Sequence, residues 1–190
     1  VLIQTCRSLL LVLSKLVENN KIKNSSYIIF VDDGSSDKTW EIINDFASSN
    51  TNVNGIKLSR NKGHQNALLA GMEYVKDKCD CLISIDADLQ QDENSIEEFV
   101  DKFNMGSEVI LGIRNDRGTD TFFKKITALS FYMLMNKLGV NIIKNHADYR
   151  LLSNRVNKSL LEFKEVNLFL RGLIPVVGYK TDYVYFDVKD

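Results

Sequence analysis

The stretch Cys81-Leu82-Ile83-Ser84-Ile85-Asp86-Ala87-Asp88-Leu89-Gln90 decides the fold, because an apolar run leads directly into two carboxylates. Such a run predicts a buried strand that presents charge at its carboxyl end. Alternate residues of an extended chain point the same way, so Asp86, Asp88 and Gln90 could converge on one cation. Oxygen ligands of this kind suit Mg²⁺ or Mn²⁺. The alternative is that Asp88 only caps a helix that begins near Asp92.

Length and composition describe one globular domain with a sizeable core. The chain has 190 residues, 44% hydrophobic and 26% charged, as in ordinary folded domains. A formal net charge of -1 provides no basic surface for DNA or RNA, so we expect no nucleic-acid partner. The apolar run at residues 9–13 is too short to span a bilayer, which favours a cytoplasmic location. The three cysteines do not complete a four-ligand zinc site and are expected to be free thiols.

Strands and helices alternate in the structure expected for the first 112 residues. Apolar runs predict strands at residues 27–31, 53–58, 82–85 and 108–112, and helical spacing predicts helices at 1–17, 40–47, 65–75 and 96–103. Ser36 or Asp37 is the expected N-cap of the second helix. This order predicts an α/β fold with a Rossmann-like, mostly parallel sheet and helices on both faces. Ligands of such sheets bind beyond the carboxyl ends of the strands, where these charged residues fall: Asp32, Asp33, Arg60, Asp86, Asp88 and Arg114.

The pattern changes after Gly118. We predict a long helix at residues 121–138, a loop, the segment Ala147-Asp148-Tyr149-Arg150-Leu151-Leu152, a helix at 156–163 and a helical turn at 169–173. A closing strand is expected within residues 176–188, with Pro175 at its start. Domains of this class normally begin with a strand, and none precedes the first helix. We therefore expect a single domain that is a fragment without its first strand.

Three motifs together resemble a known family. They are Phe30-Val31-Asp32-Asp33-Gly34-Ser35-Ser36-Asp37, Ser59-Arg60-Asn61-Lys62-Gly63-His64 and Asp86-Ala87-Asp88-Leu89-Gln90. Their order and spacing are similar to those of glycosyltransferase family 2, whose members have the GT-A fold. With the segment around Asp148 they resemble its polyprenyl-phosphate glycosyltransferase branch, which includes dolichol-phosphate mannose synthases and bactoprenol glucosyltransferases. The resemblance covers residues 27–178, and it implies that the natural protein continues into a C-terminal membrane segment.

The resemblance also implies roles for individual residues. Those expected to bind the nucleotide are Asp32, Asp33, Arg60, Gly63 and Asp86; those expected to hold Mg²⁺ or Mn²⁺ are Asp86, Asp88 and Gln90; and those expected to act in catalysis are Asp148, Asp88 and Arg114. Asp148 would serve either as a base or as a residue that orients the acceptor or the sugar. Lys124 or Lys125 would join Arg114 at phosphate, unless both lysines belong to a solvated helix face.

The implied function is inverting transfer of a hexose from a nucleotide sugar, expected to be uridine-linked, to a polyprenyl phosphate at the cytosolic face of the membrane, in cell-envelope biogenesis. Transfer to a saccharide hydroxyl is the alternative, and it needs a general base that an ionised lipid phosphate does not. A non-catalytic relative and a phosphoacceptor signalling domain are further alternatives. The signalling class places a Met-Pro loop after its later aspartate, and this chain has none there.

Overall fold

The computed structural model of this chain describes residues 1–115, 146–163 and 169–188. Within these ranges the elements follow one another in this order: α1 (Leu2–Glu18), β1 (Ile28–Asp32), α2 (Thr39–Ser49), β2 (Val53–Lys57), α3 (His64–Val75), β3 (Cys81–Ser84), η1 (Glu93–Ser95), α4 (Ile96–Asn104), β4 (Val109–Arg114), β5 (His146–Ser153), α6 (Asn154–Leu161), α7 (Leu170–Val176) and β6 (Thr181–Phe186).

The strands form two sheets. β1 and β2 pair in parallel, with Asp32 opposite Lys57 at their carboxyl ends. The other sheet has the order β3-β5-β4-β6. In it β4 and β6 run parallel, whereas β5 runs antiparallel to both of its neighbours and places Arg150 opposite Ser84. The carboxyl end of β3 therefore lies beside the middle of β5.

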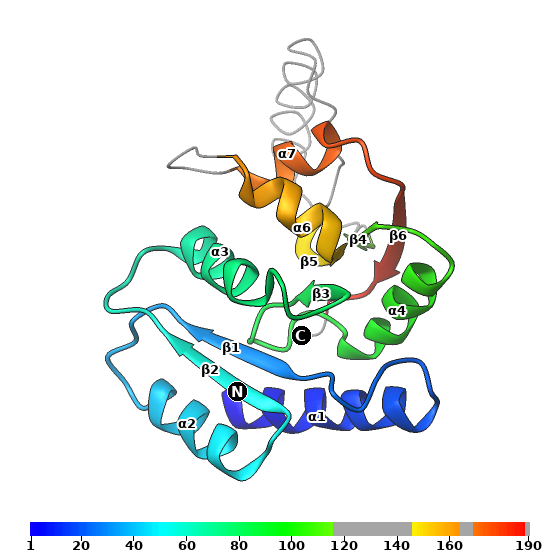
Figure 1. Cartoon of the computed structure of the whole chain (residues 1–190). Coiled ribbons are helices and arrows are strands. Elements are labelled where there is room, and N and C mark those ends of the chain that lie inside the picture. Colours follow the sequence, from blue (N-terminus) through cyan, green and yellow to red (C-terminus); the bar gives the residue numbers. More distant parts are fainter. Residues whose placement is uncertain (116–145, 164–168, 189–190) are drawn as a thin grey trace, which may run out of the picture.

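Helices cover both faces of the β1-β2 sheet. α1 and α2 lie on one side and α3 on the other (Figure 1). Phe30 packs on the first side, in a buried cluster with Cys6 of α1 and Ile43 of α2. The next residue, Val31, faces α3, where Gly71 permits close approach because a Cβ there would lie 3.2 Å from the Val31 side chain. Neighbouring residues of an apolar strand thus serve two different faces.

β4 forms the centre of the larger sheet, and its side chains alternate between two core clusters. Val109 and Leu111 pack with residues of α3, α6 and α7, whereas Ile110 packs with Phe99 of α4 and Tyr149 of β5. All five residues are fully buried or nearly so, since none exceeds 1% exposure. Burying such side chains is the main favourable contribution to folding.

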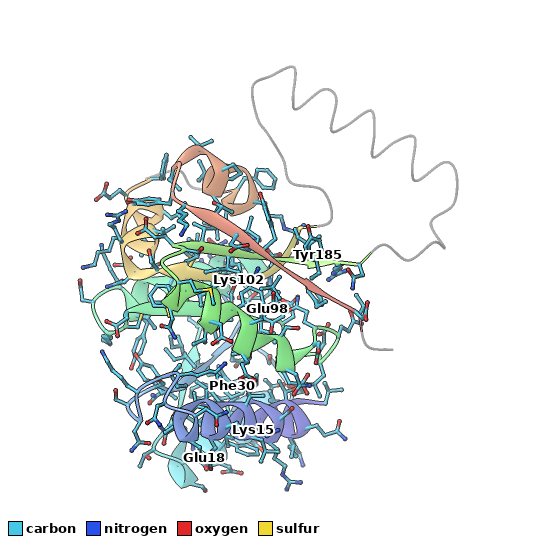
Figure 2. The ribbon with its side chains drawn as sticks, turned by 90° about the vertical axis from the view of Figure 1, so that its right-hand side faces the viewer. Lys15, Glu18, Phe30, Glu98, Lys102 and Tyr185 are labelled. Atoms are coloured by element: carbon cyan, nitrogen blue, oxygen red, sulfur yellow. The ribbon has the colours of Figure 1, made fainter. Side chains whose placement is uncertain are left out.

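Figure 2 shows α1 and α4 side by side, with Lys15 and Glu18 labelled on α1 and Glu98 and Lys102 labelled on α4. The loop after α1 is tied to α4 because Lys21 Nζ lies 2.7 Å from oxygens of Glu97 and Asp101. The two core clusters that contain side chains of β4 also hold β5 and the end of β3 in position. The charged residues gather at this part of the sheet.

The structure confirms the α/β class and the helices on both faces, and it corrects several details. β5 was not predicted as a strand, and its antiparallel direction makes the sheet more mixed than expected. Pro175 lies inside α7 rather than at the start of a strand, and β6 begins only at Thr181. Lys38, not Ser36 or Asp37, occupies the N-cap position of α2. The predicted helix at 121–138, with Lys124 and Lys125, lies outside the described residues.

Candidate active site

The loops that follow β1 and β2 are bound together. Asp33 uses both carboxylate oxygens for this: Oδ1 accepts from the N–H of Lys62 at 2.7 Å and Oδ2 from the N–H of Gly63 at 2.8 Å. Gly34 has φ +71°, and a Cβ there would lie 2.5 Å from the carbonyl carbon of Arg60, so only glycine fits. These contacts fix the second loop, from which the exposed Arg60 side chain extends.

Asp32, the last residue of β1, directly precedes these paired loops and is almost completely buried, with 2% exposure. Its Oδ1 accepts from the N–H of Ser35 at 3.0 Å. Its Oδ2 is buried without a hydrogen-bond partner among the described residues. Because leaving a buried acceptor unpaired is costly, this oxygen is well suited to a donor group on a ligand.

The loop after β3 is not an extension of the strand. β3 ends at Ser84, a turn follows at Ala87 and Asp88, and Leu89 has φ +62°. The argument from alternation therefore does not apply to Gln90, whose side chain is exposed and whose N–H donates to Asp88 Oδ1 at 3.0 Å. Metal binding by Gln90 stays a prediction.

Neighbouring elements hold the backbone of this loop on both sides. Thr5 of α1 donates its hydroxyl to the carbonyl oxygen of Ala87 at 2.8 Å. Tyr149 of β5 donates its hydroxyl to the carbonyl oxygen of Asp92 at 3.0 Å. Asp92 in turn accepts from the N–H of Asn94 and caps η1, so the capping role considered for Asp88 belongs to Asp92.

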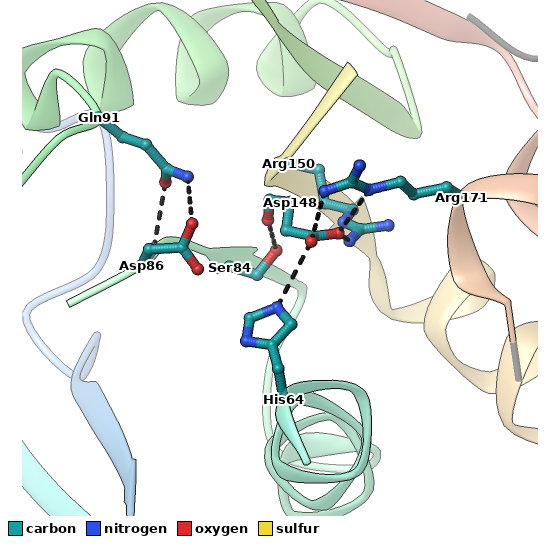
Figure 3. A network of polar contacts seen from close by, with 7 residues as sticks. All are labelled: His64, Ser84, Asp86, Gln91, Asp148, Arg150 and Arg171. Carbon is teal, nitrogen blue, oxygen red and sulfur yellow. Dashed lines mark hydrogen bonds and ion pairs between the residues drawn. The ribbon is translucent and has the colours of Figure 1, made fainter. Parts of the chain in front are cut away.

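Asp86 is held by Gln91, a buried residue with 1% exposure. The Gln91 side chain accepts from the N–H of Asp86 at 3.1 Å, and its amide nitrogen donates to Asp86 Oδ2 at 2.7 Å (Figure 3). Burial raises the pKa of the Asp86 carboxyl; the negative charges of Asp88 and Asp148 raise it further, and His64 and Arg114 act against them. Burial is therefore the main cost of ionising Asp86, and a cation bound beside this carboxylate would offset that cost.

Asp148, on β5, has the opposite surroundings. Figure 3 shows its carboxylate between Arg150, Arg171 and His64. Arg171 of α7 donates to both of its oxygens, at 3.2 Å and 2.7 Å; the guanidinium of Arg150 donates to Oδ1; and His64 Nε2 lies 3.4 Å from Oδ2. Ser84 at the end of β3 donates to the Asp148 carbonyl at 2.7 Å, which joins this residue to the Asp86 loop.

These partners determine the charge state of Asp148. Burial alone would raise its pKa, but the hydrogen bond from Arg171 and the positive charges of Arg150 and Arg171 outweigh burial and hold the pKa below its ordinary value. Asp148 is thus a firmly ionised carboxylate and a weak base. Two arginines facing one carboxylate leave excess positive charge at this end of the site.

The structure gathers the predicted residues into two neighbouring groups. Asp86, Asp88, Arg114 and Asp148 lie close enough for their charges to act on Asp86. Asp32, Asp33, Arg60 and Gly63 form the second group, at the paired loops. The link between the groups is His64, the first residue of α3, which directly follows Gly63 and reaches Asp148.

Four charged or polar residues of this site were not identified from the sequence as site residues: His64, Gln91, Arg150 and Arg171. The signal for His64 was available, since it ends one of the quoted motifs. Gln91 directly follows Gln90, and alternation along the sequence did not indicate that Gln91 is the buried residue that contacts Asp86. Arg171 offered no signal, because 23 positions separate it from Asp148 and only the packing of α7 brings them together.

Asp86 and Asp88 fit a divalent cation of the kind expected. Magnesium sites commonly use one or two protein carboxylates and fill the other positions with water and substrate phosphate. No group of three or more His, Cys, Asp or Glu side chains suited to a metal occurs in residues 1–115, 146–163 and 169–188. The two carboxylates match that minimal pattern, and a cation beside them would relieve the repulsion that raises the pKa of Asp86.

Comparison with known proteins identifies the family. Residues 7–161 match the model described as glycosyl transferase family 2, and the chain therefore belongs to glycosyltransferase family 2.

Two relatives illustrate its place in the family. The uncharacterized glycosyltransferase YkoT of Bacillus subtilis (strain 168) is 49% identical over 187 residues, which cover 98% of this chain and 56% of YkoT. Bactoprenol glucosyl transferase of Shigella phage SfV is 38% identical over 160 residues, which cover 84% of this chain and 52% of that protein. The second relative supports the polyprenyl-phosphate branch indicated by the motifs. The chain spans about half the length of the curated relatives it matches.

A solved structure supports the fold. The crystal structure of S. aureus TarS 1-349 superposes with a TM-score of 0.55 at 14% identity, over 88% of this chain and 52% of that one. Together with the family assignment, this similarity confirms the expected α/β fold of the GT-A type. Within the described part of the chain, no helix combines the length and hydropathy needed to cross a bilayer.

Proposed function

We propose that this chain catalyses inverting transfer of a hexose from a nucleotide sugar, uridine-linked, to a polyprenyl phosphate at the cytosolic face of the membrane. The observation that carries the proposal is the contrast within one site. Asp86 is a half-buried carboxylate with two other carboxylates nearby, whereas Asp148 is held between Arg150, Arg171 and His64. A donor diphosphate with its cation suits the first environment. The phosphate of an acceptor suits the second.

On the donor side, Asp86 and Asp88 would hold Mg²⁺ or Mn²⁺. The metal would supply electrostatic stabilisation of the departing nucleoside diphosphate without proton transfer. Arg114, exposed at the end of β4 and close enough to act on Asp86, is placed to add a second positive charge. Direct displacement at the sugar C1 requires no covalent intermediate, and it inverts the configuration there.

The nucleoside itself would occupy the paired loops. The unpaired Asp32 Oδ2 can accept a hydrogen bond from a base or a ribose hydroxyl. The exposed Arg60 side chain extends from the loop that Asp33 fixes in place. Asp33 itself already accepts from two backbone N–H groups, so its contribution is to shape the loop rather than to make a further contact.

On the acceptor side, the state of Asp148 favours a phosphate over a hydroxyl. Deprotonating a sugar hydroxyl calls for a base whose pKa lies near the working pH, and the pKa of Asp148 is lowered instead. A phosphate monoester is mostly ionised at pH 7 and needs cationic groups to place it. Arg171, whose side chain is 42% exposed, can be shared between Asp148 and such a phosphate.

An acceptor assay tests this proposal. Purified protein with Mn²⁺ and labelled UDP-hexoses should transfer sugar to undecaprenyl phosphate. Undecaprenol, which has the same lipid and a hydroxyl in place of the phosphate, should accept none, and free saccharides should also remain unlabelled. Transfer to saccharides but not to the lipid phosphate would contradict the proposal and establish the hydroxyl-acceptor alternative.

A further inference from the structure

The Gln91 side chain makes two hydrogen bonds to a single residue, Asp86. Its carbonyl oxygen accepts from the backbone N–H of Asp86 at 3.1 Å, and its amide nitrogen donates to Asp86 Oδ2 at 2.7 Å. The first bond requires the carbonyl oxygen to face the N–H group, so the amide nitrogen must face the carboxylate. An amide provides both bonds at once without any change of its protonation state.

These two hydrogen bonds fix the direction of the Asp86 carboxylate. Oδ2 is engaged by Gln91, which leaves Oδ1 to face whatever binds in the site. Both contacts come from a side chain that is 1% exposed, and buried hydrogen bonds of this kind hold a side chain in one rotamer.

The loop backbone has two supports besides the bond from the Asp86 N–H to Gln91. Thr5 holds the carbonyl of Ala87 on one side, and Tyr149 holds the carbonyl of Asp92 on the other. Leu89 provides the bend between them. Removing the Gln91 amide should therefore release the Asp86 side chain while the loop keeps its place.

We propose that Gln91 is a positioning residue that directs Asp86 Oδ1 toward the cation and the donor diphosphate. The inference rests on the proposed metal-dependent function. It assigns a supporting role to Gln91, a residue that the sequence did not single out, and it leaves the predicted metal binding by Gln90 unchanged.

Gln91→Met tests this, because methionine has a similar volume and removes both hydrogen bonds. Titration of Mn²⁺ into the protein without donor should show affinity about 10- to 100-fold weaker than in the wild type. The donor KM should rise at low Mn²⁺, while kcat at saturating Mn²⁺ should return close to the wild-type value. A folded variant with wild-type Mn²⁺ affinity would overturn the inference.

The matched control is Asn157→Leu. Asn157 is also a buried amide, with 0% exposure, but its nitrogen donates to the carbonyl of Met72 in the core, away from the site. This variant should lose stability without changing Mn²⁺ affinity. An equal loss of Mn²⁺ affinity in both variants would show that general destabilisation explains the effect, against the inference.

Gln91→Glu covers the case in which Gln91→Met does not fold. It keeps the shape and the bond from the Asp86 N–H, but it sets an oxygen against Asp86 Oδ2 where a donor stood. Weaker Mn²⁺ binding at pH 7 is expected, and unchanged binding would overturn the inference. Absence of Mn²⁺ binding in the wild type is a separate result, which would reject the metal-dependent function itself and the inference with it.

Discussion

Asp86 and Asp148 lie on neighbouring segments, one just beyond β3 and the other on the paired strand β5, and their surroundings have opposite charge. Asp86 is close to two other carboxylates, and its pKa is raised by burial and by their charges. Asp148 faces two arginines and His64, and its pKa is lowered in spite of burial. The fold thus places a half-buried carboxylate with two acidic neighbours next to a carboxylate that faces two arginines. The proposed reaction would use the first environment for a metal-bound diphosphate and the second for a phosphate acceptor.

The largest effect on the free energy of unfolding is expected from Asp148→Ala. Arg150 is 1% exposed, and its Nε and Nη1 have no partner within the described residues, so this change would leave it buried without its carboxylate. Breaking a buried ion pair by removing one partner costs about 3–5 kcal/mol. Chemical denaturation should show a loss of this size in the free energy of unfolding.

Asp88→Ala is the control for that measurement. Asp88 is an exposed carboxylate in the same site, and its removal should change the free energy of unfolding by no more than about 0.5 kcal/mol. Similar losses for both variants, or a loss at Asp148 below about 1 kcal/mol, would show that Arg150 does not depend on Asp148.

A smaller effect of opposite sign is expected from Asp86→Asn in protein without metal. The folded state raises the pKa of Asp86, so it binds this proton more tightly than the unfolded state does. Ionisation of Asp86 therefore costs stability as the pH rises from the ordinary aspartate pKa, about 3.9, through the raised value. Asparagine cannot ionise, and it can still accept from Gln91.

Thermal unfolding at two pH values tests the sign of the change in stability caused by Asp86→Asn. The Asp86→Asn variant should be more stable than the wild type at pH 7, and the difference should shrink toward pH 4. Added Mn²⁺ should stabilise the wild type and not the variant. A variant that is less stable than the wild type at both pH values would show that the Asp86 carboxylate is not repelled by its surroundings.

The sequence predicted those parts of the fold that depend on local pattern. β1, β3 and β4 are largely apolar runs followed by polar residues. These three strands and β2 each lie within a few residues of their expected places. β5 could not be found in this way, because Asp148 and Arg150 interrupt its apolar residues. Arg150 is nevertheless buried, and the contacts among Asp148, Arg150 and Arg171 compensate for these charges.

The site was predictable where it follows strand ends and not where packing creates it. Asp32, Asp86 and Asp88 follow from the topology of the sheet. Gln91 and Arg171 do not, because a bend at Leu89 changes which glutamine is buried, and the position of α7 decides which arginine reaches Asp148. Side-chain direction after a strand ends depends on backbone angles that spacing does not reveal.

Calorimetric titration of UDP with and without Mn²⁺, in the wild type and in Asp88→Ala, tests most directly whether the acidic end of the site holds a cation for the donor. The account predicts that Mn²⁺ tightens UDP binding to the wild type by roughly tenfold or more, and that Asp88→Ala removes this dependence. Equal UDP affinity with and without Mn²⁺, or an undiminished Mn²⁺ effect in Asp88→Ala, would contradict it.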